Sequence, residues 1–403
     1  MGIEIRTIER ERTDDYLRAV SRGFLDPTID DADLEMRRAR FLEGRWWGAL
    51  DDGAIVATLR TLPLDTTLPG RRVITSCGVT AVTTTSTHRR RGLMAEMMTR
   101  ALHDGREAGE PLTTLIAAEW PIYGRFGFGA ACEHASYEID AGRVRFRREG
   151  AGTVSLVTAD EYLAAALAVY DRHRLASPIE IARDEFVWRM DALGMPSEPF
   201  KGFYVLCHDG RGEVTGYAQY KVDKHFDQRR PASTVTVEEL MGDPDAELAL
   251  WRYVCGIDWT TRVVAHNRSV DERLPWWVVD GRHVRQTERA DAVWARPLDV
   301  AACLSARSYS APVDVVLDVV DPLKLSSGRF RLQASADGAT CASTPDGADI
   351  TCGVATLGSV LFGGYALATF ARAGLVDEHR AGAVAAATAA LRADVTPWSV
   401  TWF

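Results

Sequence analysis

The sequence lacks the features that mark membrane-spanning and nucleic-acid-binding proteins. None of its apolar runs approaches the ~18 residues that a membrane-spanning helix requires. Its 56 Asp and Glu outnumber its 47 Lys and Arg, and the formal net charge is −9. This balance argues against sequence-independent binding to nucleic acid, which needs a basic surface. It is compatible with a cationic substrate, although an acidic balance that merely favours solubility explains it as well.

Metal-binding and disulfide patterns are also missing. The seven cysteines are scattered, and no two of them have Cys-x-x-Cys spacing. The nine histidines form no His-x-x-x-His pair and no cluster with cysteine. We therefore expect free thiols in a reducing cytosol and no metal site. The first residues alternate charged and apolar side chains as a strand does, so we expect no signal peptide and a cytoplasmic protein.

What is present is a chain long enough for several hydrophobic cores. Its 403 residues predict two or three domains at roughly 150 residues each. In the first third, strand and helix patterns alternate, and Asp51-Asp52-Gly53 is typical of a hairpin turn. The pattern predicts strands over 3–8, 46–50, 54–61, 73–84 and 112–118, and helices over 13–22 and 91–108.

A second unit with the same layout begins after the basic stretch 143–150. Strands over 203–207 and 214–220 flank an Asp/Gly turn, and a strand over 233–237 leads into a helix over 245–255. Two hairpins can resemble each other by chance, so this repeat is a weak signal. The last hundred residues differ, with strands over 314–320, 328–335 and 348–352 and Ala-rich helices over 362–373 and 381–393. We expect three domains, 1–148, 149–290 and 291–403.

The stretch that carries chemistry runs from Val79 to Met94. An apolar strand ends in a loop with three consecutive arginines, Arg89 to Arg91, and Gly92 precedes an amphipathic helix. Backbone N–H groups and the positive end of the helix dipole converge at such a junction, which suits a pyrophosphate. A bare Arg-Arg-Arg-Gly would more simply be a solvated basic helix start. The strand before it and the helix after it favour the anion site.

Two other segments stand out. Tyr123 is followed by Gly-Arg-Phe-Gly-Phe, although an ordinary half-buried position is the commoner interpretation for any single tyrosine. The last six residues, Trp398 to Phe403, include three aromatic side chains. Disordered tails are usually polar, so we expect this tail to be docked. From the residues alone, a terminal strand packed for stability is the simpler interpretation.

These segments resemble those of a known superfamily. Arg89-x-x-Gly92 after an apolar strand resembles the acetyl-CoA signature of the GNAT N-acetyltransferases, and Tyr123 followed by Gly127-Phe128 resembles the segment beside the CoA sulfur. The whole chain resembles the actinobacterial Eis-type acetyltransferases. The resemblance implies two GNAT-type α/β domains, the first catalytic and the second degenerate, followed by a sterol-carrier-protein-like α+β domain. The second unit has no Arg-x-x-Gly after Val237, so we expect no CoA there.

The resemblance also implies roles for individual residues, with acetyl-CoA as co-substrate. Tyr123 matches the general acid, and Phe403, through its carboxylate, matches the general base. The positions that match the cofactor site are Val82, Thr83 and Thr84 for the pantetheine arm, Arg90, Arg91, Gly92, Leu93, Met94 and Ala95 for the pyrophosphate, and Ala118 and Glu119 at the edge of the next strand.

For the amine, the resemblance points to Phe24 and Asp26 at the end of the first helix. An Asp before Pro27 is equally well explained as a turn residue. The family implies polycationic substrates of the aminoglycoside antibiotic class, or protein lysines, and a homo-oligomer, a hexamer. Two alternatives stay open: a dedicated protein-lysine acetyltransferase, and a lipid- or ligand-binding module with a vestigial acetyltransferase domain.

Overall fold

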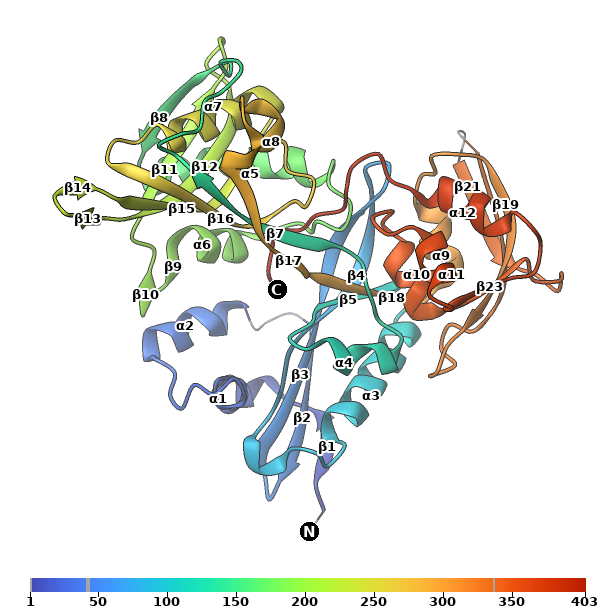
Figure 1. Cartoon of the computed structure of the whole chain (residues 1–403). Coiled ribbons are helices and arrows are strands. Elements are labelled where there is room, and N and C mark those ends of the chain that lie inside the picture. The colour runs from blue at the N-terminus through green and yellow to red at the C-terminus, as the bar shows by residue number, and fades with distance from the viewer. Residues whose placement is uncertain (1, 41–43, 336–337) are drawn as a thin grey trace. The chain divides into compact units, whose positions relative to one another are not determined.

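The computed structural model describes residues 2–40, 44–335 and 338–403, which form two compact units (Figure 1). The first unit comprises Met1–Cys132, Asp291–Pro397 and Trp402–Phe403. The second unit comprises Glu133–Ala290 and Trp398–Thr401. Each unit is therefore built from segments that are far apart in the sequence.

The first unit contains a seven-stranded sheet in the order β1-β2-β3-β4-β5-β18-β6. The hairpin between β2 and β3 is confirmed: Asp52 and Gly53 both have positive φ, 48° and 81°, as a tight two-residue turn requires. All neighbouring strands are antiparallel except β4 and β5. The strands are β1 Glu4–Thr7, β2 Arg45–Asp51, β3 Ala54–Leu68, β4 Arg72–Thr84, β5 Leu112–Ile116, β6 Gly129–Ala130 and β18 Val293–Pro297.

Helices cover both faces of this sheet. On one face lie α1 (Thr13–Gly23) and α2 (Asp31–Arg40), whose apolar residues pack with Trp46 and Leu50. On the other lies α3 (Leu93–Glu107), whose Met97, Met98 and Leu102 are buried against the sheet. The predicted strands and helices of this region are confirmed to within about two residues at most ends.

The chain crosses between the two sheets. After β6 it enters the second unit as β7 (Glu133–Asp140), and it returns from β17 (Val284–Asp291) to the first sheet as β18, between β5 and β6. β7 thus precedes the expected boundary at residue 148 yet lies in the second sheet. β18 follows the expected boundary at residue 290 yet lies in the first sheet.

The second unit repeats the plan of the first. Its sheet has the order β17-β7-β16-β15-β12-β11-β8, and β15 and β16 are parallel around helix α7, as β4 and β5 are around α3. The predicted hairpin, strand and helix are confirmed. The main elements are β8 Thr153–Val157, α5 Ala159–Arg174, α6 Glu185–Leu193, β11 Phe203–His208, β12 Val214–Asp223, β15 Ser233–Gly242, α7 Pro244–Cys255 and β16 Thr260–Arg268. Shorter ones are β9 Gly194–Met195, β10 Glu198–Pro199, β13 Phe226–Asp227, β14 Arg230–Pro231 and α8 Leu274–Trp277.

The C-terminal segment forms a five-stranded sheet in the order β21-β20-β19-β22-β23 with short helices, an α+β arrangement. The helix predicted over 362–373 is wrong in its first half, because residues 361–366 form turns. Gly363 has φ +82°, and a Cβ there would lie 2.4 Å from the Ala393 nitrogen. The elements are α9 Val300–Ala306, β19 Val313–Val320, β20 Gly328–Ser335, β21 Gly338–Ser343, β22 Ile350–Gly353, α10 Val354–Val360, α11 Leu367–Arg372, β23 Val376–Glu378 and α12 Ala383–Leu391.

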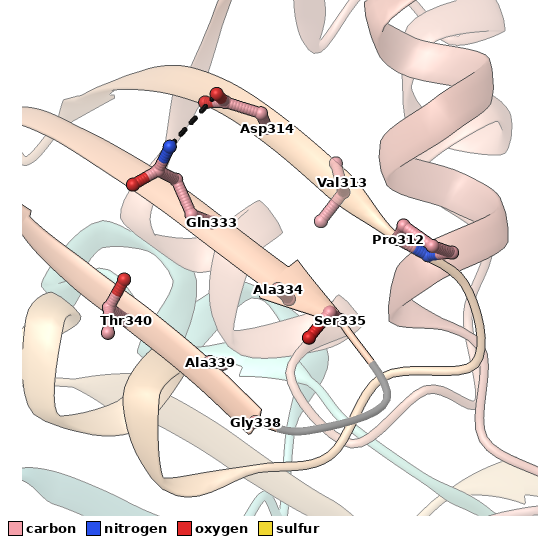
Figure 2. A pocket seen from close by; sticks show the side chains of 9 residues that line it. All are labelled: Pro312, Val313, Asp314, Gln333, Ala334, Ser335, Gly338, Ala339 and Thr340. Atoms are coloured by element: carbon pink, nitrogen blue, oxygen red, sulfur yellow. Dashed lines mark hydrogen bonds between the residues drawn. The ribbon is translucent and has the colours of Figure 1, made fainter.

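A cavity of about 720 Å³ lies at one end of this sheet (Figure 2). It is lined by residues of 312–314, 333–335 and 338–340. Gln333 donates a 3.0 Å hydrogen bond to Asp314 beside it.

Candidate active site

β4 and β5 run side by side for four residue pairs and then separate. Their parallel pairing ends at Val79 and Leu115. Directly beyond, β4 bulges at Ala81, whose φ is +51°. Thr58 Oγ1 stabilises the bulge, because it donates to the Ala81 carbonyl at 2.8 Å and lies 2.7 Å from Thr83 Oγ1. Val82, Thr83 and Thr84 therefore have no β5 partner, and their outer peptide groups can pair with an extended ligand.

The signature loop leads into the N-terminus of the 15-residue helix α3. Gly92, with φ +79°, is its N-cap, and no side chain caps the helix. The first-turn N–H groups, on Leu93, Met94 and Ala95, have no partner within the helix. A Cβ on Gly92 would meet nothing within 4 Å, so the approach is open. Arg90 and Arg91 are exposed beside it, which makes this end of α3 suitable for a pyrophosphate.

A histidine that sequence reasoning missed holds this loop to the sheet. His88 Nε2 lies 2.9 Å from Asp51 Oδ2, and its Nδ1 lies 2.8 Å from Thr87 Oγ1. Asp51 ends β2 and His88 ends the short 3₁₀ turn Ser86–His88 before the arginines. In the sequence this contact is marked only by Thr-His before Arg-Arg-Arg, a short pattern that indicates no particular partner.

Tyr123 ends the single-turn helix α4 (Trp120–Tyr123) and is buried. Its ring packs edge-on against that of Phe128, with 6.2 Å between the two ring centroids. Burial raises the pKa of the Tyr123 hydroxyl, and the negative charge of Glu119 raises it further. Among the described residues no hydrogen-bond partner contacts this hydroxyl. Tyr123 therefore keeps its proton at neutral pH and has it free to donate.

The two residues expected at the edge of the next strand lie just beyond it. β5 ends at Ile116, and Ala118 and Glu119 form the exposed bend between β5 and α4. They thus occupy the connection to Tyr123 and not the strand, because Pro121 starts a new helical turn so soon after β5.

The carboxyl group of Phe403 lies at the point where β4 and β5 separate. Thr80 Oγ1 donates a 2.9 Å hydrogen bond to a terminal oxygen of Phe403. Thr80 directly follows Val79, the last β4 residue that pairs with β5. The Phe403 ring packs against Gly78, where a Cβ would lie 3.2 Å from Cδ2. Phe403 and Tyr123 thus belong to the same compact unit.

The residues before Phe403 are docked in the second unit, so the docked tail is confirmed. Glu180 accepts hydrogen bonds from the Val400 nitrogen at 2.7 Å and from Ser399 Oγ at 3.1 Å. Thr401 is 2% exposed, and its hydroxyl bonds to Tyr170 at 2.7 Å and to Arg183 Nε at 2.9 Å. These side chains are buried and polar, so specific hydrogen bonds fix the position of the tail.

The expected amine-binding residues lie at the end of α1. Gly23 abuts β4, since a Cβ there would lie 2.1 Å from Thr83 Oγ1. The next residue, Phe24, is 57% exposed, and Asp26 is exposed in the turn that follows. The Asp26 nitrogen donates to the Ser21 carbonyl at 2.9 Å, which agrees with a turn role. This turn is thus held beside the strand that carries the bulge.

Within the described part of the chain, no three His, Cys, Asp or Glu side chains are grouped as metal ligands are. No helix among the described residues is long and apolar enough to cross a membrane. All seven cysteines are buried, and none of them forms a disulfide.

Three family models match successive parts of the chain. A GNAT acetyltransferase domain model matches residues 4–131, and a second one matches residues 180–297. A sterol carrier protein domain model matches residues 300–400. The expected order of two GNAT domains and a sterol-carrier-like domain is therefore correct.

Relatives match nearly the whole chain. An uncharacterized N-acetyltransferase of Streptomyces avermitilis is 37% identical over 407 residues, 98% of this chain and 97% of that protein. N-acetyltransferase Eis of Mycobacterium tuberculosis is 32% identical over 81% of this chain and 80% of its own length. The crystal structure of Eis1 from Mycobacterium abscessus superposes with a TM-score of 0.87 and 30% identity, over 99% of this chain and 100% of that one. The chain is an acyltransferase and belongs to the Eis-type family of GNAT N-acetyltransferases.

Proposed function

We propose that this enzyme transfers the acetyl group of acetyl-CoA to primary amines of polycationic small molecules of the aminoglycoside class. The observation that carries the proposal is the hydrogen bond from Thr80 to the Phe403 carboxyl group at the point where β4 and β5 separate. A carboxylate here can take a proton from an amine whose acetyl donor enters between the two strands.

One acetyl-CoA would bind per chain, in the first unit. The peptide groups of Val82, Thr83 and Thr84 would pair with the pantetheine arm, the uncapped start of α3 (Arg90 to Ala95) would hold the pyrophosphate, and Ala118 and Glu119 would border the other side. The matching helix of the second unit, α7, starts differently. Asp243 caps it and accepts from the nitrogens of Asp245 and Ala246. Its N-terminal donors are thus occupied by a carboxylate, which would repel a phosphate.

Phe403, the backbone near Val82 and Tyr123 would each act at a different step of the reaction. The Phe403 carboxylate takes a proton from the substrate ammonium, and the freed amine nitrogen bonds to the acetyl carbon. The backbone N–H near Val82 donates to the oxyanion that forms. As the carbon–sulfur bond breaks, Tyr123 gives its proton to the thiolate, and its raised pKa keeps that proton available at neutral pH. The nitrogen of the intermediate loses its second proton to the Tyr123 phenolate, which restores the phenol, and the proton held by Phe403 is released to solvent.

The exposed turn with Phe24 and Asp26 would contact the amine substrate, and the net charge of −9 would favour a cationic one. By family relation we further propose a cytoplasmic homo-oligomer, a hexamer. The functional boundaries at 148/149 and 290/291 stay part of this proposal, although β7 lies in the sheet of the second unit and β18 in the sheet of the first.

A thiol-release assay with acetyl-CoA over aminoglycosides, polyamines and lysine peptides tests the proposal. We expect aminoglycosides and polyamines to release thiol fastest, and Tyr123→Phe to abolish most of the signal. Release with peptides alone would make the enzyme a protein-lysine acetyltransferase. No release with any amine would leave a binding module with a vestigial site.

A further inference from the structure

A fully buried ion pair joins the first sheet to the C-terminal segment. Arg296 lies on β18 and Asp321 follows β19, and both side chains are 0% exposed. Arg296 Nη2 donates to Asp321 Oδ2 at 2.8 Å and Nη1 to Oδ1 at 3.2 Å. Burying two charges is costly, so the pair needs further partners to be tolerated.

The further partners come from the loop after Asp321. Its carboxylate also accepts from the nitrogens of Leu323 at 3.0 Å, Leu325 at 2.8 Å and Ser326 at 2.8 Å. Ser326 Oγ in turn donates to the Pro297 carbonyl of β18 at 2.9 Å. One carboxylate thus shapes the loop, and Ser326 attaches that loop to β18.

The guanidinium group of Arg296 also touches the segment that carries Tyr123. Gly127 has φ +82°, and a Cβ there would lie 1.9 Å from Arg296 Nη1 and 3.1 Å from Cζ. The guanidinium therefore lies directly against the backbone of Gly127, the residue that separates Phe126 from Phe128 in the sequence. The Gly127 nitrogen donates to the Gly124 carbonyl at 3.0 Å, so the whole turn after Tyr123 is tied together.

The loop after Asp321 also contributes to the hydrophobic cluster to which Tyr123 belongs. Leu323 and Leu325 pack against the core cluster that contains Tyr123, Phe126 and Phe128. Close backbone approach fixes the neighbouring strands as well. A Cβ on Gly129 of β6 would lie 2.0 Å from the Ala355 carbonyl of α10. The C-terminal segment is thereby packed against the turn of the catalytic tyrosine over several contacts.

We infer that the sterol-carrier-like segment serves this enzyme as a positioning element for Tyr123, through Arg296, Asp321 and the loop 321–327. The inference rests on the proposed role of Tyr123 as general acid. Arg296 and Asp321 are positioning residues: Arg296 touches the Tyr123 turn at Gly127, Asp321 holds Arg296 in place, and both act on the reaction through that turn. Small displacements of a catalytic group are enough to slow a reaction.

A double-mutant cycle separates positioning from general structural damage. Asp321→Asn is introduced into the wild-type chain and into Tyr123→Phe, and kcat and the KM for acetyl-CoA are measured. We expect kcat to fall by about 10²-fold in the wild-type background, with little change in KM. In the Tyr123→Phe background we expect little further fall, because the group being positioned is already gone.

Asp314→Asn is the matched control. Asp314 also forms a two-bond pair with an arginine of the same sheet, Arg331, at 2.9 and 2.8 Å, but both are about half exposed. The Asp314→Asn substitution should leave kcat unchanged in both the wild-type and the Tyr123→Phe backgrounds. If Asp321→Asn does not fold, Ser326→Ala removes only the hydroxyl that attaches the loop to β18, and the same cycle is run with it.

Equal falls in kcat in both backgrounds, or an effect on KM alone, would overturn the positioning role while leaving the proposed chemistry intact. Wild-type turnover in Tyr123→Phe by itself would instead overturn the general-acid proposal and this inference with it. The two failures are therefore distinguishable within one experiment.

Discussion

Thr80 Oγ1 and a terminal oxygen of Phe403 are 2.9 Å apart, although the two residues are 323 positions apart in the sequence. Thr80 is the first β4 residue beyond the pairing with β5. Ser399 and Thr401 of the preceding tail are buried and hydrogen-bonded, so the end of the chain loses its conformational freedom to reach this place. The bond locates the proposed general base beside the place where we propose that the acetyl donor enters.

Residues added after Phe403, or amidation of its carboxyl group, should abolish most of the activity without unfolding the protein. Either change removes the negative charge beside Thr80, and the aromatic side chains that dock remain. The loss should be largest below the pKa of the substrate amine, where a base is needed to free the nucleophile. The measurement is kcat against pH for the native and extended forms, together with their melting temperatures.

Thr80→Val provides the matched control, since it keeps the carboxylate and removes only its hydrogen bond. It should lower kcat less than the extension does, with an unchanged KM for acetyl-CoA. Identical pH profiles for the native and the extended enzyme would show that the carboxylate of Phe403 is not the base.

Gly92→Glu should destroy acetyl-CoA binding while the protein stays folded. Gly92 has φ +79° and open space around its Cα, so the new side chain meets solvent and puts a negative charge at the anion site. Gly109 at the other end of α3 has φ +75° and equally open space, so Gly109→Glu carries the same backbone strain without that charge. Calorimetry should find one site per chain in the wild type and in Gly109→Glu, and none in Gly92→Glu. Two sites in the wild type would contradict the expectation that the second unit is degenerate.

Local patterns predicted much of the fold. The hairpin at Asp52 and Gly53 was found because its turn chemistry is local, and α3 because its apolar residues recur at helical spacing. The false helix start at residue 362 has the opposite cause. Ala-rich sequence favours a helix, but Gly363 adopts a left-handed conformation and packs against Ala393.

Long-range pairings could not be predicted in this way. Nothing local in β7 or β18 indicates which sheet each one joins, because the alternation of side chains fixes only the buried face. The same holds for Arg296, whose sequence neighbourhood is that of an ordinary strand arginine and whose partner Asp321 lies in the loop after β19. The family resemblance predicted that the Phe403 carboxylate lies in the active site, but it did not predict that Thr80 is its hydrogen-bond partner.

Tyr123→Phe should lower kcat by ~10²–10⁴-fold, the usual effect of losing a general acid. The affinity for acetyl-CoA should hardly change, because the hydroxyl acts only as the thiolate leaves and has no hydrogen-bond partner among the described residues to lose. Single-turnover kinetics and cofactor titration measure the two quantities separately. Wild-type turnover would leave Tyr123 as a packing residue beside Phe128.

Glu119→Gln should move the alkaline limb of the kcat profile to lower pH. Burial is the larger cause of the raised pKa of Tyr123 and the charge of Glu119 the smaller one. Removing the charge lowers the pKa towards the ordinary value near 10, so the acid form is lost at a lower pH than in the wild type. The limb should disappear in Tyr123→Phe. If the alkaline limb of the kcat profile does not move in Glu119→Gln, it reports the ionisation of a group other than Tyr123.

Thr401→Val should slow the enzyme although it changes neither the proposed acid nor the proposed base. The replacement keeps the shape of the side chain and removes the hydroxyl that bonds Tyr170 and Arg183 Nε. Arg183 keeps its two bonds to Glu239, so the second unit should stay folded, at a cost of about 1–3 kcal/mol in the free energy of unfolding. The tail loses two hydrogen bonds that hold it two residues before Phe403. We therefore expect kcat to fall while the KM for acetyl-CoA stays the same.

Thr401→Ser is the test of this mechanism, since it restores the hydroxyl and should recover most of the lost turnover. Thr351→Val serves as the control, because it removes a threonine hydroxyl that bonds His379 at 2.9 Å in the C-terminal sheet. It should leave kcat unchanged. If the valine and serine variants at position 401 turn over at the same rate while differing in melting temperature, the hydroxyl stabilises the second unit and does nothing for the reaction.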